Sequence, residues 1–127
     1  MRKVALFAGV ALACGVPGAA LAQPEELVVV GVPDGGLAAA PLMAHDYARA
    51  ARRLAAPRPD AANDPARLIN LGNAYAGMGR MADAREAYRS ARFAPDALLV
   101  LANGQQASSR DIARLALGRL ETSYAMR

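Results

Sequence analysis

The stretch from Asp64 to Pro95 restricts the fold of this chain more than any other part of the sequence. Asp64-Pro65 predicts a helix start, because aspartate accepts hydrogen bonds from the first turn and proline is tolerated at the first helical position. Gly77-Met78-Gly79 predicts the end of that helix. A second amphipathic helix is expected from about Met81 to Phe93, and Pro95 closes it. Two helices joined by so short a turn form an antiparallel pair.

The composition favours closely packed helices and excludes several kinds of site. Hydrophobic residues make up 54% of the 127 residues, whereas aromatic residues make up only 5%. Alanine and leucine dominate the apolar fraction, which suits helices rather than a sandwich of bulky strands. The single cysteine excludes a disulfide framework and a cysteine-based zinc site within one chain. The lone histidine argues against a histidine-rich metal centre, so we expect neither a metal nor a cofactor.

Residues 1–22 have the three-part pattern of a secretory signal peptide. Arg2 and Lys3 provide the positive start, and Val4 to Ala13 form an apolar run that is too short to span a bilayer. Pro17-Gly18 breaks the helix, and Ala20-Leu21-Ala22 offers small residues at the cleavage site. We therefore expect cleavage after Ala22 and a periplasmic or secreted protein.

The alternative is that the N-terminal segment is retained or lipidated, which would be the only route of membrane contact. Cys14 is the one candidate for lipidation, although Ala11 stands where a bacterial lipoprotein signal places leucine. Cleavage also removes the only lysine, Lys3. The remaining arginines alternate with acidic residues and form no basic stripe with neighbouring aromatics, so no nucleic-acid role is expected.

The segments between the signal and the helical pair have a mixed pattern. Residues 23–36 are predicted to be a strand or a mobile tail, because Leu27–Val32 is short, rich in β-branched residues and followed by a Pro-Asp-Gly-Gly turn. Residues 37–64 are predicted to form a helix over Leu37–Ala56 and then a linker. Pro57 and Pro59 forbid a continuous helix through that linker.

Residues 99–127 are predicted to complete a β-hairpin and then form a C-terminal capping helix. Ala97–Ala102 is short and apolar, Asn103-Gly104 is a strong hairpin signal, and Gln105–Ala107 is the expected return strand. Ser108 or Ser109 can cap the helix that follows. If Leu27–Val32 lies beside Ala97–Ala102, a three-stranded sheet results. The expected fold is therefore mainly α, with an antiparallel helical hairpin, flanking helices and a small appended β-hairpin or sheet.

Residues 65–98 resemble one tetratricopeptide repeat, a helix–turn–helix unit of about 34 residues. The matching positions are Leu71, Gly72, Tyr75, Gly79, Ala84, Tyr88 and Ala91, with Pro95 near the end. Gly72 and Ala84 are small where the two helices cross, and Gly79 permits the tight turn. A shift of 34 residues places Tyr88 on Leu54, so residues 37–64 are interpreted as a degenerate half-repeat.

The resemblance implies binding of a protein or peptide on a concave surface lined by the first helix of the repeat. The residues of that surface are Ala66, Ile69, Asn70, Asn73 and Gly77. Asn73 matches a position where the family often uses asparagine to bond the main chain of a ligand, and Asn70 matches a second such position. Ile69 stands where the family's carboxylate clamp needs lysine, so that clamp is not expected.

No catalytic arrangement is visible in the sequence. His45 precedes Asp46 directly, and adjacent residues on a helix do not face each other. The Ser108-Ser109 pair lacks a general base at a recognisable spacing. We expect no enzyme activity and no small-molecule substrate. The hypothesis is an exported tetratricopeptide-like adaptor, and the alternative is a self-associating structural protein of the envelope.

Overall fold

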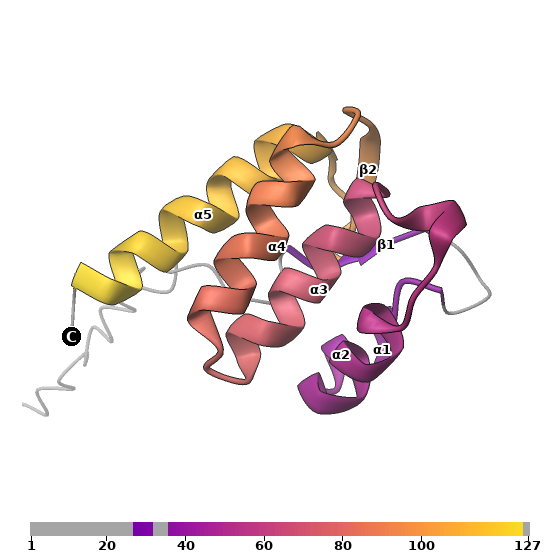
Figure 1. Ribbon diagram of the computed structural model, residues 1–127. Coiled ribbons are helices and arrows are strands. Elements are labelled where there is room, and N and C mark those ends of the chain that lie inside the picture. The colour runs from indigo at the N-terminus through magenta and orange to yellow at the C-terminus, as the bar shows by residue number, and fades with distance from the viewer. Residues whose placement is uncertain (1–26, 32–35, 126–127) are drawn as a thin grey trace, which may run out of the picture.

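The two helices of the Asp64–Pro95 stretch form as their boundary residues predict (Figure 1). Helix α3 spans Pro65–Gly77, and its first turn is capped by the Asp64 carboxylate, which accepts a 3.0 Å hydrogen bond from the Ala66 amide. The chain then turns through Gly79, whose positive φ of 76° suits a residue without Cβ. Helix α4 spans Met81–Phe93 and runs back along α3.

The computed structural model describes residues 27–31 and 36–125. The predictions for the signal peptide, for cleavage after Ala22 and for lipidation of Cys14 lie outside these residues. Among the described residues no helix is both long enough and apolar enough to cross a bilayer.

The remaining helices extend the α3–α4 pair on both sides. Helix α1 (Ala39–Met43) leads into α2 (Tyr47–Ala55), which packs on α3, and α5 (Ser109–Ala125) packs on α4. A short 3-10 helix, η3 (Pro59–Ala61), lies in the proline-rich linker. Helices α2, α3, α4 and α5 therefore stand in a row, as Figure 1 shows.

The expected single helix over Leu37–Ala56 is wrong in one respect, because α1 and α2 are separate. The break falls at His45, which adopts a left-handed φ of 58°. The Asp46 carboxylate then caps the new helix by accepting a 3.3 Å hydrogen bond from the Arg49 amide. A side-chain cap that starts a second helix competes with continuation of the first, and here the cap prevails.

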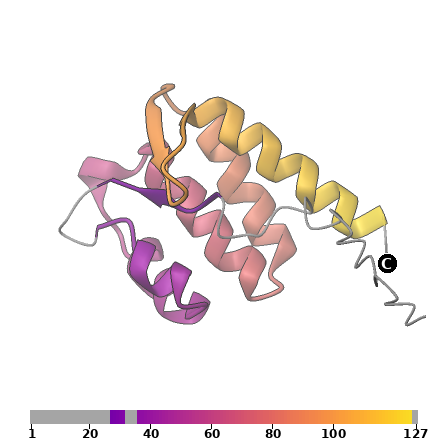
Figure 2. The same cartoon turned by 180° about the vertical axis from the view of Figure 1, so that it is seen from behind.

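The three-stranded antiparallel sheet is confirmed, with the strand order β1-β2-β3. Strand β1 is Val29–Val30, β2 is Leu98–Leu101 and β3 is Gln106–Ser108. Of the predicted strand Leu27–Val32, residues 27, 28 and 31 lie outside β1, and Val32 is not among the described residues. Val29 lies opposite Leu101, and Leu99 lies opposite Ala107. The sheet covers one side of the helical row, the side that faces the viewer in Figure 2.

Two apolar clusters meet at helix α3. The larger cluster lies between α3, α4, α5 and the sheet, and it includes Ile69, Ala84, Tyr88 and Ile112. The smaller cluster packs α1 and α2 against the other side of α3. Alanine and glycine line the helix crossings, so the helix axes approach closely. A Cβ atom at Gly72 would overlap the ring of Tyr88, which explains why glycine is needed there.

Candidate functional site

The centre of the candidate site is Asn70, a polar side chain with no exposed surface on helix α3. Its Oδ1 accepts a 2.8 Å hydrogen bond from the Val29 amide, and its Nδ2 donates to the Val29 carbonyl at 2.8 Å. The same Nδ2 donates to the Leu37 carbonyl, also at 2.8 Å. One side-chain amide thus pairs with both main-chain groups of Val29, as a neighbouring strand would.

Asn73 continues this arrangement one turn along α3. Its Nδ2 donates to the Leu27 carbonyl at 3.0 Å, and its Oδ1 accepts a 2.7 Å hydrogen bond from the Tyr88 hydroxyl. Burial raises the pKa of Tyr88 above its ordinary value of 10.0, against the opposing effect of Arg119. The hydroxyl therefore stays protonated at ordinary pH and remains a hydrogen-bond donor to Asn73.

The alternation of a strand explains why these two asparagines fit the segment Leu27–Val30. In an extended chain, successive residues direct their main-chain groups to opposite sides. The Leu27 and Val29 carbonyls therefore point toward α3, while the Val28 carbonyl accepts a 2.8 Å hydrogen bond from the Ala102 amide on the other side. Two side chains of α3 thus bond the edge of the Leu27–Val30 segment that a further strand would otherwise bond. We call these residues, Asn70 and Asn73, the asparagine pair.

Apolar contacts hold the side chains of the same segment. Leu27 and Val29 belong to the larger cluster, whereas Val28 belongs to the smaller one. All three are almost fully buried. The site therefore holds this segment of its own chain in two ways: main-chain hydrogen bonds that are indifferent to sequence, and alternate apolar side chains that enter two cores.

The structure places the five residues of the expected partner-binding surface as follows. Ala66, Ile69, Asn70 and Asn73 are buried, and the chain's own residues 27–30 lie against the asparagine pair. Gly77 is exposed at the end of α3, where Tyr47 of α2 lies against it. The surface that the sequence assigns to a separate partner is therefore covered by the chain itself in this structure.

Most residues of the predicted repeat lie at the contact between α3 and α4, whereas Leu71 packs on the side of α3 that faces α1 and α2, and Gly79 lies in the turn. Ala84, Tyr88 and Ala91 are buried, and Tyr88 packs on Gly72. Leu71 and Tyr75 are half-buried, and the Arg80 guanidinium carbon lies 4.6 Å from the centroid of the Tyr75 ring. The sequence interpretation of Tyr88 missed its hydroxyl. A buried tyrosine normally bonds a polar partner, and this rule could have directed attention to a polar residue of α3 such as Asn73.

A second polar cluster joins the hairpin to α5. The Asp96 carboxylate accepts hydrogen bonds from the Ser108 hydroxyl at 2.8 Å, the Ser109 hydroxyl at 3.0 Å and the Arg110 amide at 3.1 Å. These hydrogen bonds, with the one from Ser108 as the largest cause, lower the pKa of Asp96 to about 2. The predicted serine cap is thus extended by a carboxylate from the preceding loop, and the cluster has a structural role at the helix start.

Asp96 is expected to make stability depend on pH in the acid range. Its folded-state pKa lies below the ordinary 3.8, so its contribution is present above about pH 4 and is lost as the pH falls toward about 2. We expect the melting temperatures of wild type and Asp96→Ala to differ at pH 6 and to converge as the pH approaches 2. A difference that stays constant over this range would show that the charge of Asp96 has no part in it.

Among the described residues there is no cluster of three or more histidine, cysteine or acidic residues that could hold a metal ion. His45 stacks on Tyr47 with ring centroids 5.6 Å apart. Comparison of the chain with protein-family models, curated proteins and solved structures gave no match.

Proposed function

We propose that this chain is an exported, tetratricopeptide-like adaptor that holds an extended segment of a partner protein along α3. The proposal of export rests on the signal-peptide pattern of residues 1–22. The proposal of a repeat-like scaffold is supported by the row of helices α2–α5 and by the close contact of Gly72 with Tyr88. Neither feature by itself identifies a ligand.

The observation that carries the proposal is the contact of the asparagine pair with a main chain. Asn70 satisfies both the amide and the carbonyl of Val29, and Asn73 satisfies the carbonyl of Leu27. These groups belong to every polypeptide, so the same pair can hold any extended segment whose alternate side chains are apolar and of similar size. The chain's own segment serves as an example of the ligand that this surface accepts.

A partner segment would bind by replacing residues 27–30. The resident segment is tethered to the body, so its effective concentration at α3 is of the order of mM. A free peptide must compete with that concentration, and the intact chain therefore binds weakly. A substitution that weakens the attachment of the resident segment is expected to strengthen binding of the free peptide by a similar factor.

The test uses a fluorescein-labelled peptide with the sequence of residues 24–31 and the chain variant Val29→Pro. Proline has no amide hydrogen, so the variant cannot donate to Asn70 Oδ1 and its own segment is loosened. We expect the peptide to bind the variant at least about tenfold more tightly than it binds wild type. A peptide with proline at the position of Val29 is the matched control and should bind neither chain.

Fluorescence anisotropy gives the affinity and far-UV circular dichroism reports folding. If Val29→Pro is unfolded alone, the wild-type peptide is expected to restore its helical signal and the control peptide is not. Absence of binding to a folded variant, or equal binding of both peptides, would remove the partner-holding role.

A self-associating structural protein of the envelope is the second candidate function. The observation that favours it is that every copy carries the Leu27–Val30 segment, so the segment of one copy matches the α3 surface of another. Exchange of an identical element is a common route to dimers. Light scattering would then give a mass that rises with concentration, whereas a strict monomer at all concentrations contradicts this candidate.

A further inference from the structure

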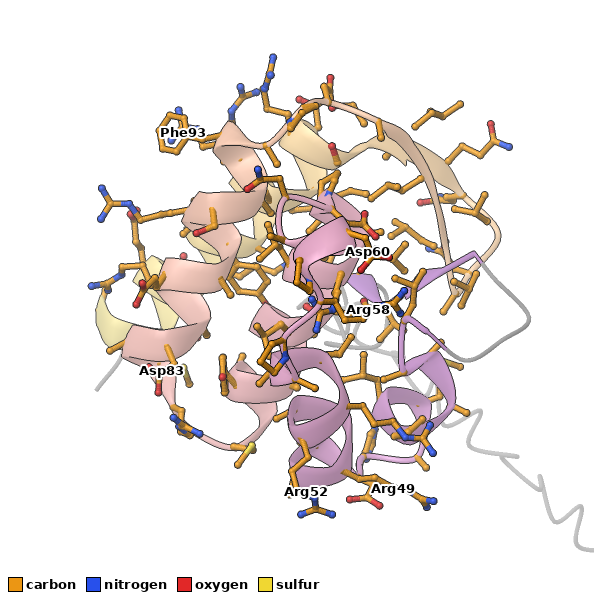
Figure 3. All side chains as sticks on the ribbon, turned by 45° about the vertical axis from the view of Figure 1, so that its right-hand side comes forward. Arg49, Arg52, Arg58, Asp60, Asp83 and Phe93 are labelled. Atoms are coloured by element: carbon orange, nitrogen blue, oxygen red, sulfur yellow. The ribbon has the colours of Figure 1, made fainter. Side chains whose placement is uncertain are left out.

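A groove lies along the outer side of α4, and it shares no lining residue with the asparagine pair. Its volume is about 710 Å³. One wall is α4 with the Ala94-Pro95 segment, and Asn63, in the loop that precedes α3, contributes to the other. In Figure 3, α4 is the helix on which Asp83 and Phe93 are labelled.

The helical wall of this groove carries positive charge. Arg85 and Arg89 both line it, because residues four apart share one helix face. Among the described residues of the lining, Glu86 is the one acidic side chain. Arg92 follows one turn later, with its guanidinium carbon 5.8 Å from the centroid of the Phe93 ring. The described lining of the groove thus combines two arginines with one glutamate, which gives a net positive charge.

An exposed aromatic side chain stands at one end of the groove. Phe93 is 78% exposed, the highest value among the large hydrophobic residues that the structure describes. Figure 3 shows its ring projecting from the C-terminal end of α4, away from the body of the protein. Exposure of a phenylalanine ring to water is unfavourable. Covering the ring with an apolar side chain of a partner therefore lowers the free energy.

We propose that the α4 groove binds an acidic polypeptide segment of a partner protein. Its carboxylates pair with Arg85 and Arg89, for which planar guanidinium groups are suited, and an apolar side chain of the same segment packs on Phe93. A polypeptide fits better than a lipid surface because the site is concave. It fits better than a nucleic acid because two arginines beside a glutamate do not form the extended basic stripe that a phosphate backbone needs.

Two labelled octapeptides test this proposal by fluorescence anisotropy at low salt: one alternates glutamate and leucine, and the other alternates lysine and leucine. We expect the acidic peptide to bind and the basic peptide not to bind. The double variant Arg85→Gln/Arg89→Gln should weaken binding of the acidic peptide at least about tenfold. The matched control is Arg52→Gln/Arg53→Gln, which removes two exposed charges from α2, and it should change the affinity less than about twofold.

The variant Phe93→Ser separates the apolar contribution from the charges. It should weaken binding of the acidic leucine peptide and leave binding of octaglutamate unchanged. Equal losses for the α4 and α2 double variants would attribute binding to net charge and overturn the proposal. The proposal would also be overturned if the protein bound phosphatidylglycerol vesicles more strongly than the peptide and the α4 double variant abolished this vesicle binding. Because Asn70 and Asn73 lie outside the groove, failure here leaves the adaptor proposal intact.

Discussion

Asn70→Ala is expected to lower the free energy of unfolding by at least about 3 kcal/mol. The substitution leaves the amide and carbonyl of Val29 and the carbonyl of Leu37 without their side-chain partner. Asn70 has no exposed surface, so water cannot replace these bonds without opening the structure. Each unsatisfied buried group costs about 1–3 kcal/mol, and a small domain has only about 5–15 kcal/mol in total.

Urea denaturation measures the loss, and hydrogen exchange of the Val29 amide locates it. Exchange of this amide should accelerate more than that of amides inside α4, because the segment detaches first. Asn103→Ala is the control: Asn103 is an exposed asparagine whose side chain bonds Gln105, its neighbour in the hairpin turn. Equal losses for the two variants would show that Asn70 has no special part in the fold.

Helix boundaries were predictable because their causes are local. Asp64 bonds an amide two residues away, and the turn at Gly79 needs a conformation that a single residue provides. The Asn103-Gly104 turn likewise depends on neighbours in the sequence, and it was correctly assigned. Each of these features can be read in a window of a few residues. The break at His45 was missed because two local preferences compete there, and their balance is not visible in the pattern.

The surroundings of the asparagine pair were not predictable in the same way. Asn70 and Asn73 lie one turn apart on α3, and that pattern is the same whether their face meets solvent, a partner or the chain itself. The residues that cover them are 41 and 46 positions away in the sequence. No periodicity connects such distant segments. A strand at Leu27–Val32 was one of two alternatives predicted for this part of the chain, and β1 forms at Val29–Val30 within it. Only the apolar side chains suggested burial, and nothing specified α3 as a neighbour of the strand.

The hydroxyl of Tyr88 shows how the packing of α4 depends on this pair. The Tyr88 hydroxyl is held by its hydrogen bond to Asn73, and the ring packs directly against Gly72. Tyr88 is 4% exposed, so almost all of its ring surface is in contact with protein. A change at Gly72 is therefore transmitted to Asn73 and then to the main chain of Leu27. The packing of α4 on α3 and the attachment of the Leu27–Val30 segment to α3 therefore depend on the same contacts.

Gly72→Ala is accordingly expected to destabilise the protein by about 2 kcal/mol, although alanine favours helices more than glycine does. The added Cβ overlaps the Tyr88 ring, and displacement of the ring disturbs its hydrogen bond to Asn73. Gly118→Ala makes the same chemical change at an exposed site in α5, where nothing lies within 4 Å of the new Cβ. That variant should gain about 0.5–1 kcal/mol from helix propensity alone. Thermal denaturation of both variants should therefore give shifts of opposite sign, whereas a gain for both would mean that Gly72 and Tyr88 are not in close contact.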